Sequence, residues 1–438
     1  MSTENNKLKS IGVNYKKSQK HYKTAKYPIR QPIYLTWLIW FLSKILLSTH
    51  KKKVERINME GLKPPYMILS NHMSFVDMEL VALGTRMQRV NSVVNLDGFY
   101  NRPWLLEWIG AIGTRKFTQD MHLIKSIKKV LDRGDVLCMY PEAVFSPCGV
   151  LCYMPDSLGA LVKKLKVPVV VANHHGNHLR APAWNYRQKR KVPFHTTLTK
   201  VLTPEDMKDM TAEEINKLLK NALDYDDYKY QKDNNILITE DYRANNIHKI
   251  LYHCPHCKTE SKMNSAGIEL WCEECGKRWR LNEDGTLSAQ EGETEFSHVP
   301  DWFKWQKKEV KKQIDSGRYN FEDEVDVFSQ PHAWKYHYLG KAKLRHNENE
   351  GFVLEGNYRN KDYRIIRTPL ENMGVHVEYD FAYVKKIKGD CFAISTNNDS
   401  FFCYPSKPNV VTKINFATEE IYKKTIKAIK KQKAENNN

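Results

Sequence analysis

One histidine and one aspartate, five positions apart, are the clearest candidates for catalytic residues in this 438-residue chain. His72 and Asp77 are the only pair with this spacing. A carboxylate beside an imidazole fixes the tautomer of the ring and stabilises the imidazolium that forms when the ring takes a proton from an attacking hydroxyl. The pair could therefore act as a general base near neutral pH. The alternative is a core histidine beside an aspartate that caps a helix.

The elements around this pair indicate an α/β domain. The apolar run 66–70 precedes His72 and the apolar run 75–83 follows it, which predicts a junction between a strand and a helix. Two more apolar runs, 137–140 and 167–172, predict further strands, and the first of them ends in Pro141-Glu142. Catalytic residues often lie where a strand ends and a helix begins. We expect a mixed sheet with helices packed on it.

Four blocks, taken in order, resemble the glycerolipid acyltransferase family, which includes the 1-acylglycerol-3-phosphate acyltransferases. The family has an Asn-His-x4-Asp block, a Gly-rich block ending in Arg, a Phe-Pro-Glu-Gly-Thr-Arg block and a Val-Pro-Ile-Val-Pro-Val block. Their counterparts are residues 71–77, 108–116, 140–146 and 167–172, within roughly residues 60 to 210. The resemblance implies an O-acyltransferase of phospholipid biosynthesis. It would move a fatty acyl group from acyl-CoA or acyl carrier protein to a lysophospholipid hydroxyl.

The resemblance also implies roles for individual residues. His72 would be the general base and Asp77 would orient it. The substrate-binding residues would be Asn71, Arg115, Lys116, Glu142 and Ser146. Of these, Glu142 would position the glycerol part of the acceptor, although it could instead be a carboxylate that accepts backbone N–H groups at a helix N-terminus. No Gly-x-Ser-x-Gly segment offers a serine nucleophile, so direct transfer without a covalent enzyme intermediate is expected.

One position departs from the family pattern. Where the third block usually reads Glu-Gly-Thr-Arg-Ser, the chain has Phe145 in place of the arginine. A phenyl ring cannot form the charge-assisted pair of hydrogen bonds with phosphate that an arginine forms. Either another cation binds the phosphate, with Arg115, Lys116 and Arg180 as candidates, or the acceptor is not a simple lysophosphatidate. The main alternative function is lipid sensing without catalysis, by a protein with the fold of this family.

The N-terminal segment 1–58 predicts a membrane-surface element. Residues 1–56 contain 13 Lys or Arg against two Glu, out of a net charge of +18 for the chain. The apolar run 33–47 that follows is shorter than the ~20 residues needed to span a bilayer, and Lys44 interrupts it. Tryptophans and flanking lysines suit a helix in the interface of a membrane with anionic lipids. We expect this helix to lie on the cytoplasmic face of the cell membrane. The alternative is an amphipathic helix packed on the domain. A cleavable signal is not indicated.

Two Cys-x2-Cys pairs predict a metal site. Cys254 and Cys257 are followed after 14 residues by Cys272 and Cys275. Four thiolates with this spacing can hold Zn²⁺ in a tetrahedral structural site. The segment 250–285 resembles a zinc ribbon, and its metal would substitute for a hydrophobic core. The alternatives are disulfides or a redox pair.

Two further segments complete the organisation. A polar run near residue 235 indicates the end of an acyltransferase domain at 59–235, and the segment 211–223 predicts an amphipathic helix. Residues 300–438 predict a helix, then short aromatic-rich strands, then a terminal helix, in an order similar to a pleckstrin-homology-like domain. A purely structural β-rich domain is equally consistent. Nucleic acid is disfavoured as a partner, because the excess positive charge lies in the N-terminal arm and no recognition pattern is present.

Overall fold

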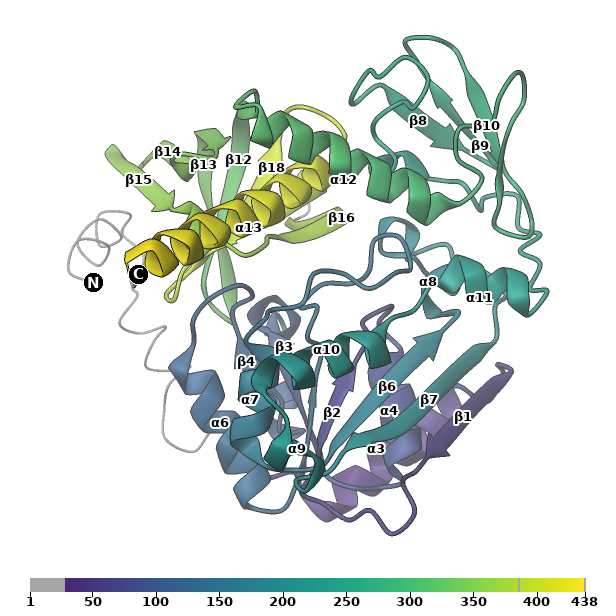
Figure 1. Ribbon diagram of the computed structural model, residues 1–438, viewed down its shortest axis with the longest axis vertical. Coiled ribbons are helices and arrows are strands. Elements are labelled where there is room, and N and C mark those ends of the chain that lie inside the picture. The colour runs from purple at the N-terminus through teal and green to yellow at the C-terminus, as the bar shows by residue number, and fades with distance from the viewer. Residues whose placement is uncertain (1–27, 385–386, 437–438) are drawn as a thin grey trace.

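The computed structural model describes residues 28–384 and 387–436 of the chain. Most of the predicted basic arm, residues 1–27, therefore lies outside the described residues. The described chain forms an α/β domain, a small all-β region that holds the four cysteines, and a C-terminal antiparallel domain with a long terminal helix (Figure 1). The expected fold class is confirmed.

A seven-stranded mixed sheet forms the centre of the α/β domain. Every neighbouring pair of strands is parallel except β6 and β7, which are antiparallel. In sheet order the strands are β1 Lys52–Ile57, β7 Phe194–Leu202, β6 Val169–His175, β2 Met67–Ser70, β5 Val136–Met139, β3 Val90–Asn95 and β4 Ile112–Thr114. The predicted strands became β2, β5 and β6. These are central strands buried on both faces, which is why their sequences are continuously apolar.

Helices cover both faces of this sheet (Figure 1). Because side chains alternate along a strand, Met67 and Leu69 pack into one core with residues of α6, α7 and α10, while Ile68 packs into another with Val81 of α4. The helices are α3 Ile33–Leu46, α4 Asp77–Thr85, α5 Pro103–Trp108, α6 Met121–Asp132, α7 Leu158–Leu165, α8 Asn177–Arg180, α9 Asp206–Asp209, α10 Ala212–Leu223 and α11 Asp227–Asp233. Helix α10 begins where the sequence predicts, with Thr211 and Glu214 in a capping box.

The cysteine-bearing region is a four-stranded antiparallel sheet in the order β11-β10-β9-β8. Its strands are β8 Met263–Ala266, β9 Glu269–Cys272, β10 Arg278–Leu281 and β11 Leu287–Ala289. Buried side chains here, such as Trp279, belong to the same continuous core as Trp184 of the α/β domain and Phe416 of the C-terminal helix. The three parts are therefore packed together rather than joined only by linkers.

The C-terminal domain is a seven-stranded antiparallel sheet with two helices. Its strand order is β15-β14-β13-β12-β18-β17-β16. The strands are β12 Asn320–His332, β13 Lys335–Asn347, β14 Gly351–Tyr358, β15 Lys361–Arg367, β16 His376–Val384, β17 Ile387–Ser395 and β18 Ser400–Pro405. Helix α12, Val299–Asp315, packs on α13, Val411–Asn436, with the Phe303 and Phe416 rings 4.7 Å apart. The likeness to a pleckstrin-homology domain stays a prediction.

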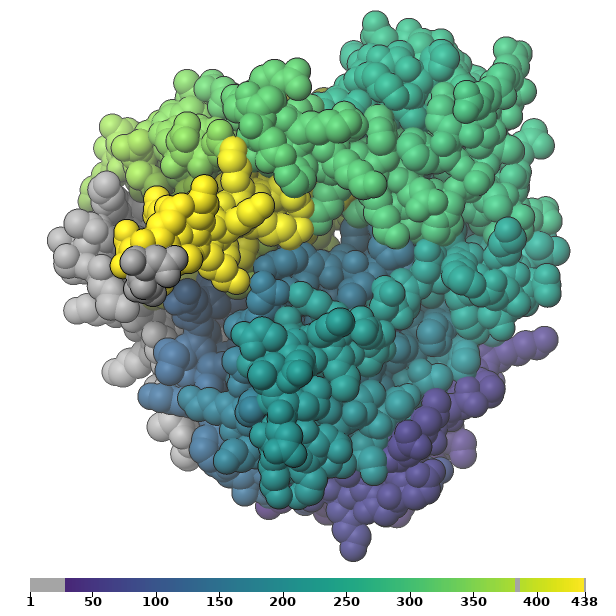
Figure 2. Space-filling view, in the orientation of Figure 1, coloured from purple at the N-terminus to yellow at the C-terminus, as the bar shows by residue number. Residues whose placement is uncertain are grey.

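Helix α13 also lies along the boundary with the α/β domain. Figure 2 shows it in yellow against the blue and teal surface. Tyr422 of α13 meets Tyr153 edge to face at 6.5 Å, beside a cavity of about 440 Å³ between the two domains. The C-terminal domain therefore covers part of the α/β domain on the side where β2, β5, β3 and β4 end.

Candidate functional site

The predicted base lies at the carboxyl edge of the sheet. His72 follows β2, Glu142 follows β5 and Lys116 follows β4. These strands are parallel, so their carboxyl ends meet along one edge, and this edge is where α/β folds place their binding sites. The same edge carries Asp97, which follows β3 in the short helix η2, Leu96–Phe99.

His72 and Asp77 are in contact. The His72 Nδ1 atom lies 3.1 Å from Asp77 Oδ2. The same carboxylate oxygen accepts the backbone N–H groups of Met73 at 2.7 Å and Ser74 at 3.0 Å, while Asn177 donates its amide to Oδ1 at 2.8 Å. Asp77 is almost fully buried, and these bonds hold it as the first residue of α4. The local fold thus fixes the orientation of His72 from one side.

Electrostatics keep this pair in the states that a general base needs. Burial is the main cause that lowers the pKa of His72, and the hydrogen bond to Asp77 opposes it. Burial also opposes ionisation of Asp77, but the neighbouring His174, His72 and the Ser74 N–H keep its pKa below the usual value. Asp77 is therefore an anion at neutral pH and His72 a neutral ring. A neutral ring whose Nδ1 donates to Asp77 leaves Nε2 as the proton acceptor.

Two aromatic rings enclose His72. The Tyr140 ring is stacked on it at 4.0 Å and the Phe145 ring lies on it at 4.0 Å, and Phe75 contacts Phe145 edge to face. The side chain of His72 nevertheless remains 19% exposed. The ring is thus desolvated over its faces and still open to a substrate. Phe145, which replaces the arginine of the family block, contributes to this enclosure.

Three of the predicted substrate-binding residues make hydrogen bonds within the protein. The Asn71 amide pairs with the backbone of His174 in both directions, at 2.8 and 3.1 Å. Glu142 accepts the N–H of His72 at 3.3 Å and that of Cys152 at 2.7 Å. The Ser146 hydroxyl donates to a backbone carbonyl at 2.7 Å and its N–H donates to the His72 carbonyl at 2.8 Å. These contacts shape the loop around His72, and substrate binding by these residues stays a prediction.

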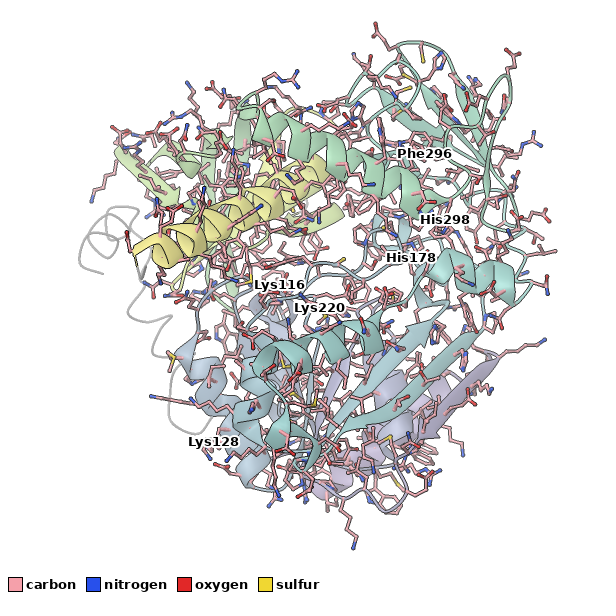
Figure 3. All side chains as sticks on the ribbon, in the orientation of Figure 1. Lys116, Lys128, His178, Lys220, Phe296 and His298 are labelled. Atoms are coloured by element: carbon pink, nitrogen blue, oxygen red, sulfur yellow. The ribbon has the colours of Figure 1, made fainter. Side chains whose placement is uncertain are left out.

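The two basic residues after β4 point to different surroundings. The Arg115 guanidinium is buried and donates to the carbonyls of Gln330, Pro331 and Asn398 and to the Ser400 hydroxyl, at 2.8 to 3.2 Å. Arg115 therefore fastens the C-terminal domain to the α/β domain. Lys116 lies in the space between the two domains (Figure 3). Burial lowers its pKa, and its charge in turn helps to lower the pKa of His72.

An apolar cavity of about 490 Å³ begins next to this site. It lies between α3, α4 and the sheet, and its wall includes Met78 and Glu79, the two residues after Asp77. Glu79 is its one acidic group; burial raises the pKa of this carboxyl. Small-molecule sites are commonly apolar cavities of ~300–1,000 Å³ with few polar groups. The cavity thus suits an apolar ligand. His72 is not among the residues that line it, but Asp77, which contacts His72, directly precedes Met78 of its wall.

Helix α3 forms one wall of that cavity, and its apolar side chains are exposed to solvent, including Leu42, Ile45 and Leu46 of that wall. Eight large apolar side chains of α3 are between 43% and 60% exposed: Ile33, Tyr34, Trp37, Leu38, Phe41, Leu42, Ile45 and Leu46. Trp104, 62% exposed, and Trp108, whose ring is 6.3 Å from that of Tyr34, extend the surface. A helix that is apolar on all sides is usually buried or lies against a membrane. Within residues 28–384 and 387–436, no helix is both long enough and apolar enough to cross a bilayer.

The four predicted metal ligands lie together. Their Sγ atoms all lie within 4.8 Å of one another. Cys254 is 3.8 Å from Cys275, and Cys257 is 3.7 Å from Cys272. Thiolates bound to one tetrahedral zinc at ~2.3 Å would be about 3.8 Å apart, so the donor set fits this metal. These distances are too long for a disulfide.

Some residues of the site were not predicted from the sequence. Asn177 holds Asp77 from the end of β6, and the rule that directs attention to the ends of strands could have found it. Tyr140 lies within a predicted apolar run, and nothing in its sequence context indicates that its ring stacks on His72. His376 and Glu378 come from β16 of the C-terminal domain, and nothing local in the sequence connects them with His72.

Comparisons with known proteins include a distant structural likeness. No protein-family model matches the chain, and no curated protein sequence matches it. Among solved structures, the chain is similar to the 1-acyl-sn-glycerophosphate (LPA) acyltransferase PlsC from Thermotoga maritima, with 14% sequence identity and a TM-score of 0.37. The likeness covers 49% of this chain and 83% of that one. A likeness this distant carries no conclusion about activity, so the function has to be inferred from the contacts of His72 and the cavity beside it.

Proposed function

We propose that this protein is an acyltransferase that moves a fatty acyl group from acyl-CoA or acyl carrier protein to a hydroxyl of a lysolipid with a glycerol backbone. The observation that carries the proposal is a neutral, Asp77-bound His72 beside an apolar cavity whose outer wall is an exposed apolar helix. A base, a space for an acyl chain and a surface for lipid are the three things this reaction needs.

The proposed reaction uses His72 as base and then as acid. The Nε2 atom takes the proton of the acceptor hydroxyl while the oxygen attacks the thioester carbonyl carbon. The tetrahedral intermediate breaks its C–S bond, and the leaving thiolate takes the proton from the imidazolium. Asp77 stabilises the transient positive charge. A well-placed base supplies ~10²- to 10⁴-fold in rate, and positioning of both substrates supplies more.

Membrane association is part of the proposal. The exposed face of α3, together with Trp104 and Trp108, would lie in the interface of a membrane with anionic lipids on its cytoplasmic side. An acyl chain could then enter the cavity beside α3 without crossing water. Vesicle sedimentation tests this: replacing Trp37 and Phe41 with aspartate should abolish binding, and replacing exposed Tyr338 of the C-terminal domain should not.

The four cysteines would hold a structural Zn²⁺ that stabilises the β8–β11 region. Cysteine thiolates are typical of closed structural zinc sites. The metal has no part in the proposed acyl transfer.

The decisive experiment is acyl transfer by the purified full chain from radiolabelled acyl-CoA to a panel of lysolipids. We expect His72→Ala to reduce incorporation by at least 100-fold, and His337→Ala, a partly exposed histidine of β13, to leave it unchanged. Equal incorporation by wild type and His72→Ala would exclude His72 as the base. Lipid binding without incorporation into any acceptor would favour a lipid-sensing role.

A further inference from the structure

We propose that the acceptor head group binds between the two domains, in a site formed by Asp97 and Lys116 of the α/β domain and His376 and Glu378 of the C-terminal domain. We infer that this head group presents hydroxyl or ammonium groups and carries no phosphate monoester. The inference rests on the proposed function, because it names the substrate class of the same site.

The side chains of this site form a compact cluster across the domain boundary. His376 Nδ1 lies 3.3 Å from Asp97 Oδ2, and His376 Nε2 lies 2.8 Å from Glu378 Oε1. The side chain of His376 is only 4% exposed, while Asp97 and Glu378 keep 13% and 17% exposure. One imidazole thus lies between two carboxylates that remain partly accessible, and its Nδ1 atom makes no hydrogen bond within the described chain.

The cluster lies close to His72. Lys116 interacts electrostatically with Asp97 and Glu378 on one side and with His72 on the other. Lys116 and His376 both help to lower the pKa of His72, so both lie within electrostatic range of it. A group bound among these side chains would therefore place a neighbouring hydroxyl near the base.

The domain boundary is rigid enough to make such a site. The buried Arg115 joins the domains through four hydrogen bonds. Gln330 donates to the Leu96 carbonyl at 3.1 Å, next to Asp97. A Cβ atom on Gly374, two residues before His376, would lie 2.8 Å from the Phe117 ring, so the backbone approaches this loop closely.

The charges of the site oppose a phosphate dianion. Two carboxylates face one ammonium, so the net charge is −1 with a neutral His376 and zero with a protonated one. Neither state leaves the positive charge that phosphate monoesters require. Hydroxyl or ammonium groups of a head group could donate to the exposed carboxylate oxygens of Asp97 and Glu378.

The other two candidate phosphate-binding residues, Arg115 and Arg180, are engaged elsewhere. Arg115 is bound to the C-terminal domain. Arg180 donates to the Arg190 carbonyl at 3.0 Å, lies 2.6 Å from His50 Nε2 and stacks over Phe194. Phe145 places a ring against His72. These contacts favour the second of the two interpretations of the sequence, in which the acceptor is not lysophosphatidate.

A divalent cation in the cluster would reverse this conclusion. The ligand atoms of Asp97, His376 and Glu378 lie within 4.8 Å of one another, which would suit a metal. In the structure, however, His376 Nε2 lies 2.8 Å from Glu378 Oε1, and the Lys116 ammonium already supplies a positive charge near both carboxylates. We therefore favour a site that binds an organic head group.

The test separates binding from catalysis. Binding of monoacylglycerol, a long-chain amino alcohol and lysophosphatidate to the full-length His72→Ala protein is measured by equilibrium dialysis below their micellar concentrations, with and without Mg²⁺. We expect monoacylglycerol, which keeps the glycerol backbone, to bind at least tenfold more tightly than lysophosphatidate. Tenfold tighter binding of the amino alcohol alone would support the inferred head group and contradict an acceptor with a glycerol backbone. Stronger binding of lysophosphatidate, binding of none of the three, or lysophosphatidate binding that requires Mg²⁺ would overturn the inference. Tenfold selectivity without acyl transfer by wild type would refute the proposed function alone.

Variants locate the selectivity. Glu378→Gln and Asp97→Asn each make the site more positive by one charge. Each should therefore reduce the ratio of the affinity for monoacylglycerol to the affinity for lysophosphatidate at least fivefold. Lys116→Met should increase this ratio. Glu322→Gln, which alters an exposed carboxylate of β12, is the matched control and should change nothing. Limited proteolysis checks that the two domains are still docked in these variants. If they are, and both carboxylate variants keep the wild-type selectivity, the head group binds elsewhere.

Discussion

Replacing Asp77 with asparagine should separate catalysis from stability. The Asp77 Oδ2 atom accepts three hydrogen bonds, from His72, Met73 and Ser74, and an asparagine oxygen can take its place. The new NH₂ group would then face the Asn177 amide, which donates to Asp77 at 2.8 Å. The Asn177 Oδ1 atom is buried and has no hydrogen-bond partner within the described chain. Turning the Asn177 amide by half a rotation would convert a clash between donors into a hydrogen bond.

The expected magnitudes follow from this geometry. The number of hydrogen bonds is kept, so the free energy of unfolding should fall by only about 1 kcal/mol. Catalysis loses the carboxylate charge that stabilises the imidazolium. Since a positioned base supplies ~10²- to 10⁴-fold, kcat/KM should fall by a large part of this range, equivalent to ~3–5 kcal/mol of transition-state stabilisation.

The pH dependence gives a second measurement. A base works in its neutral form, and burial between Tyr140 and Phe145 lowers the pKa of His72, so wild-type kcat/KM should begin to fall only below pH 6.5. The hydrogen bond to Asp77 is the main cause that raises this pKa, so the variant should lose activity at a still lower pH. Acyl transfer from radiolabelled acyl-CoA between pH 4.5 and 8, with denaturant unfolding of both proteins, measures these changes. Wild-type rates and an unshifted acidic limb in Asp77→Asn would refute the assigned pair.

Four other changes test separate parts of the molecule. Burial raises the pKa of Glu142 to about 7, so its contribution to stability is complete below pH ~4.5 and is lost as pH rises through 7. The free energy of unfolding of Glu142→Gln, measured with denaturant, should therefore increase relative to that of wild type by about 3 kcal/mol between pH 4.5 and pH 8. Ala82→Phe, which fills the apolar cavity, should shorten the preferred acyl chain in competition assays, whereas Ala82→Ser should not. Cys275→Ser should lower bound zinc below one per chain by elemental analysis and expose the β8–β11 region to protease. Arg115→Met leaves buried carbonyls without hydrogen-bond donors. The free energy that docks the C-terminal domain on the α/β domain should therefore fall by ~2–4 kcal/mol, which would be measured as faster amide hydrogen exchange in β18.

The central part of the fold could be predicted because its strands are buried on both faces. β2, β5 and β6 read as continuous apolar runs, and α10 has a complete capping box. Strand β1 could not be predicted because it is an edge strand with no fully buried residue, so its lysines indicated only a basic surface. Strand β12 was missed although Phe321, Val325 and Val327 point into the core, because acidic residues occupy the alternate positions.

The residues of the site could be predicted where their partners are close in sequence and could not where their partners are distant. His72 and Asp77 are five residues apart, and the two cysteine pairs, whose contacts join residues 15 and 21 positions apart, have the spacing of a metal site, so spacing alone could predict that each set meets. Arg115 could not be placed by such reasoning. Its partners lie 215 to 285 positions further along the chain, and three of the four are backbone carbonyls, which any sequence would offer.

The arrangement of domains changes what the C-terminal sheet can be expected to do. A domain added for binding alone could dock anywhere on the α/β domain, but here Arg115 fixes it over the edge of the sheet that carries His72. This contact brings His376 and Glu378, at the start of β16, to Asp97 at the end of β3. The acid groups of the proposed head-group site are thus shared between two domains. Acceptor selection would then depend on their docking, and loosening the Arg115 contact should weaken selectivity for the head group more than it weakens acyl-CoA binding.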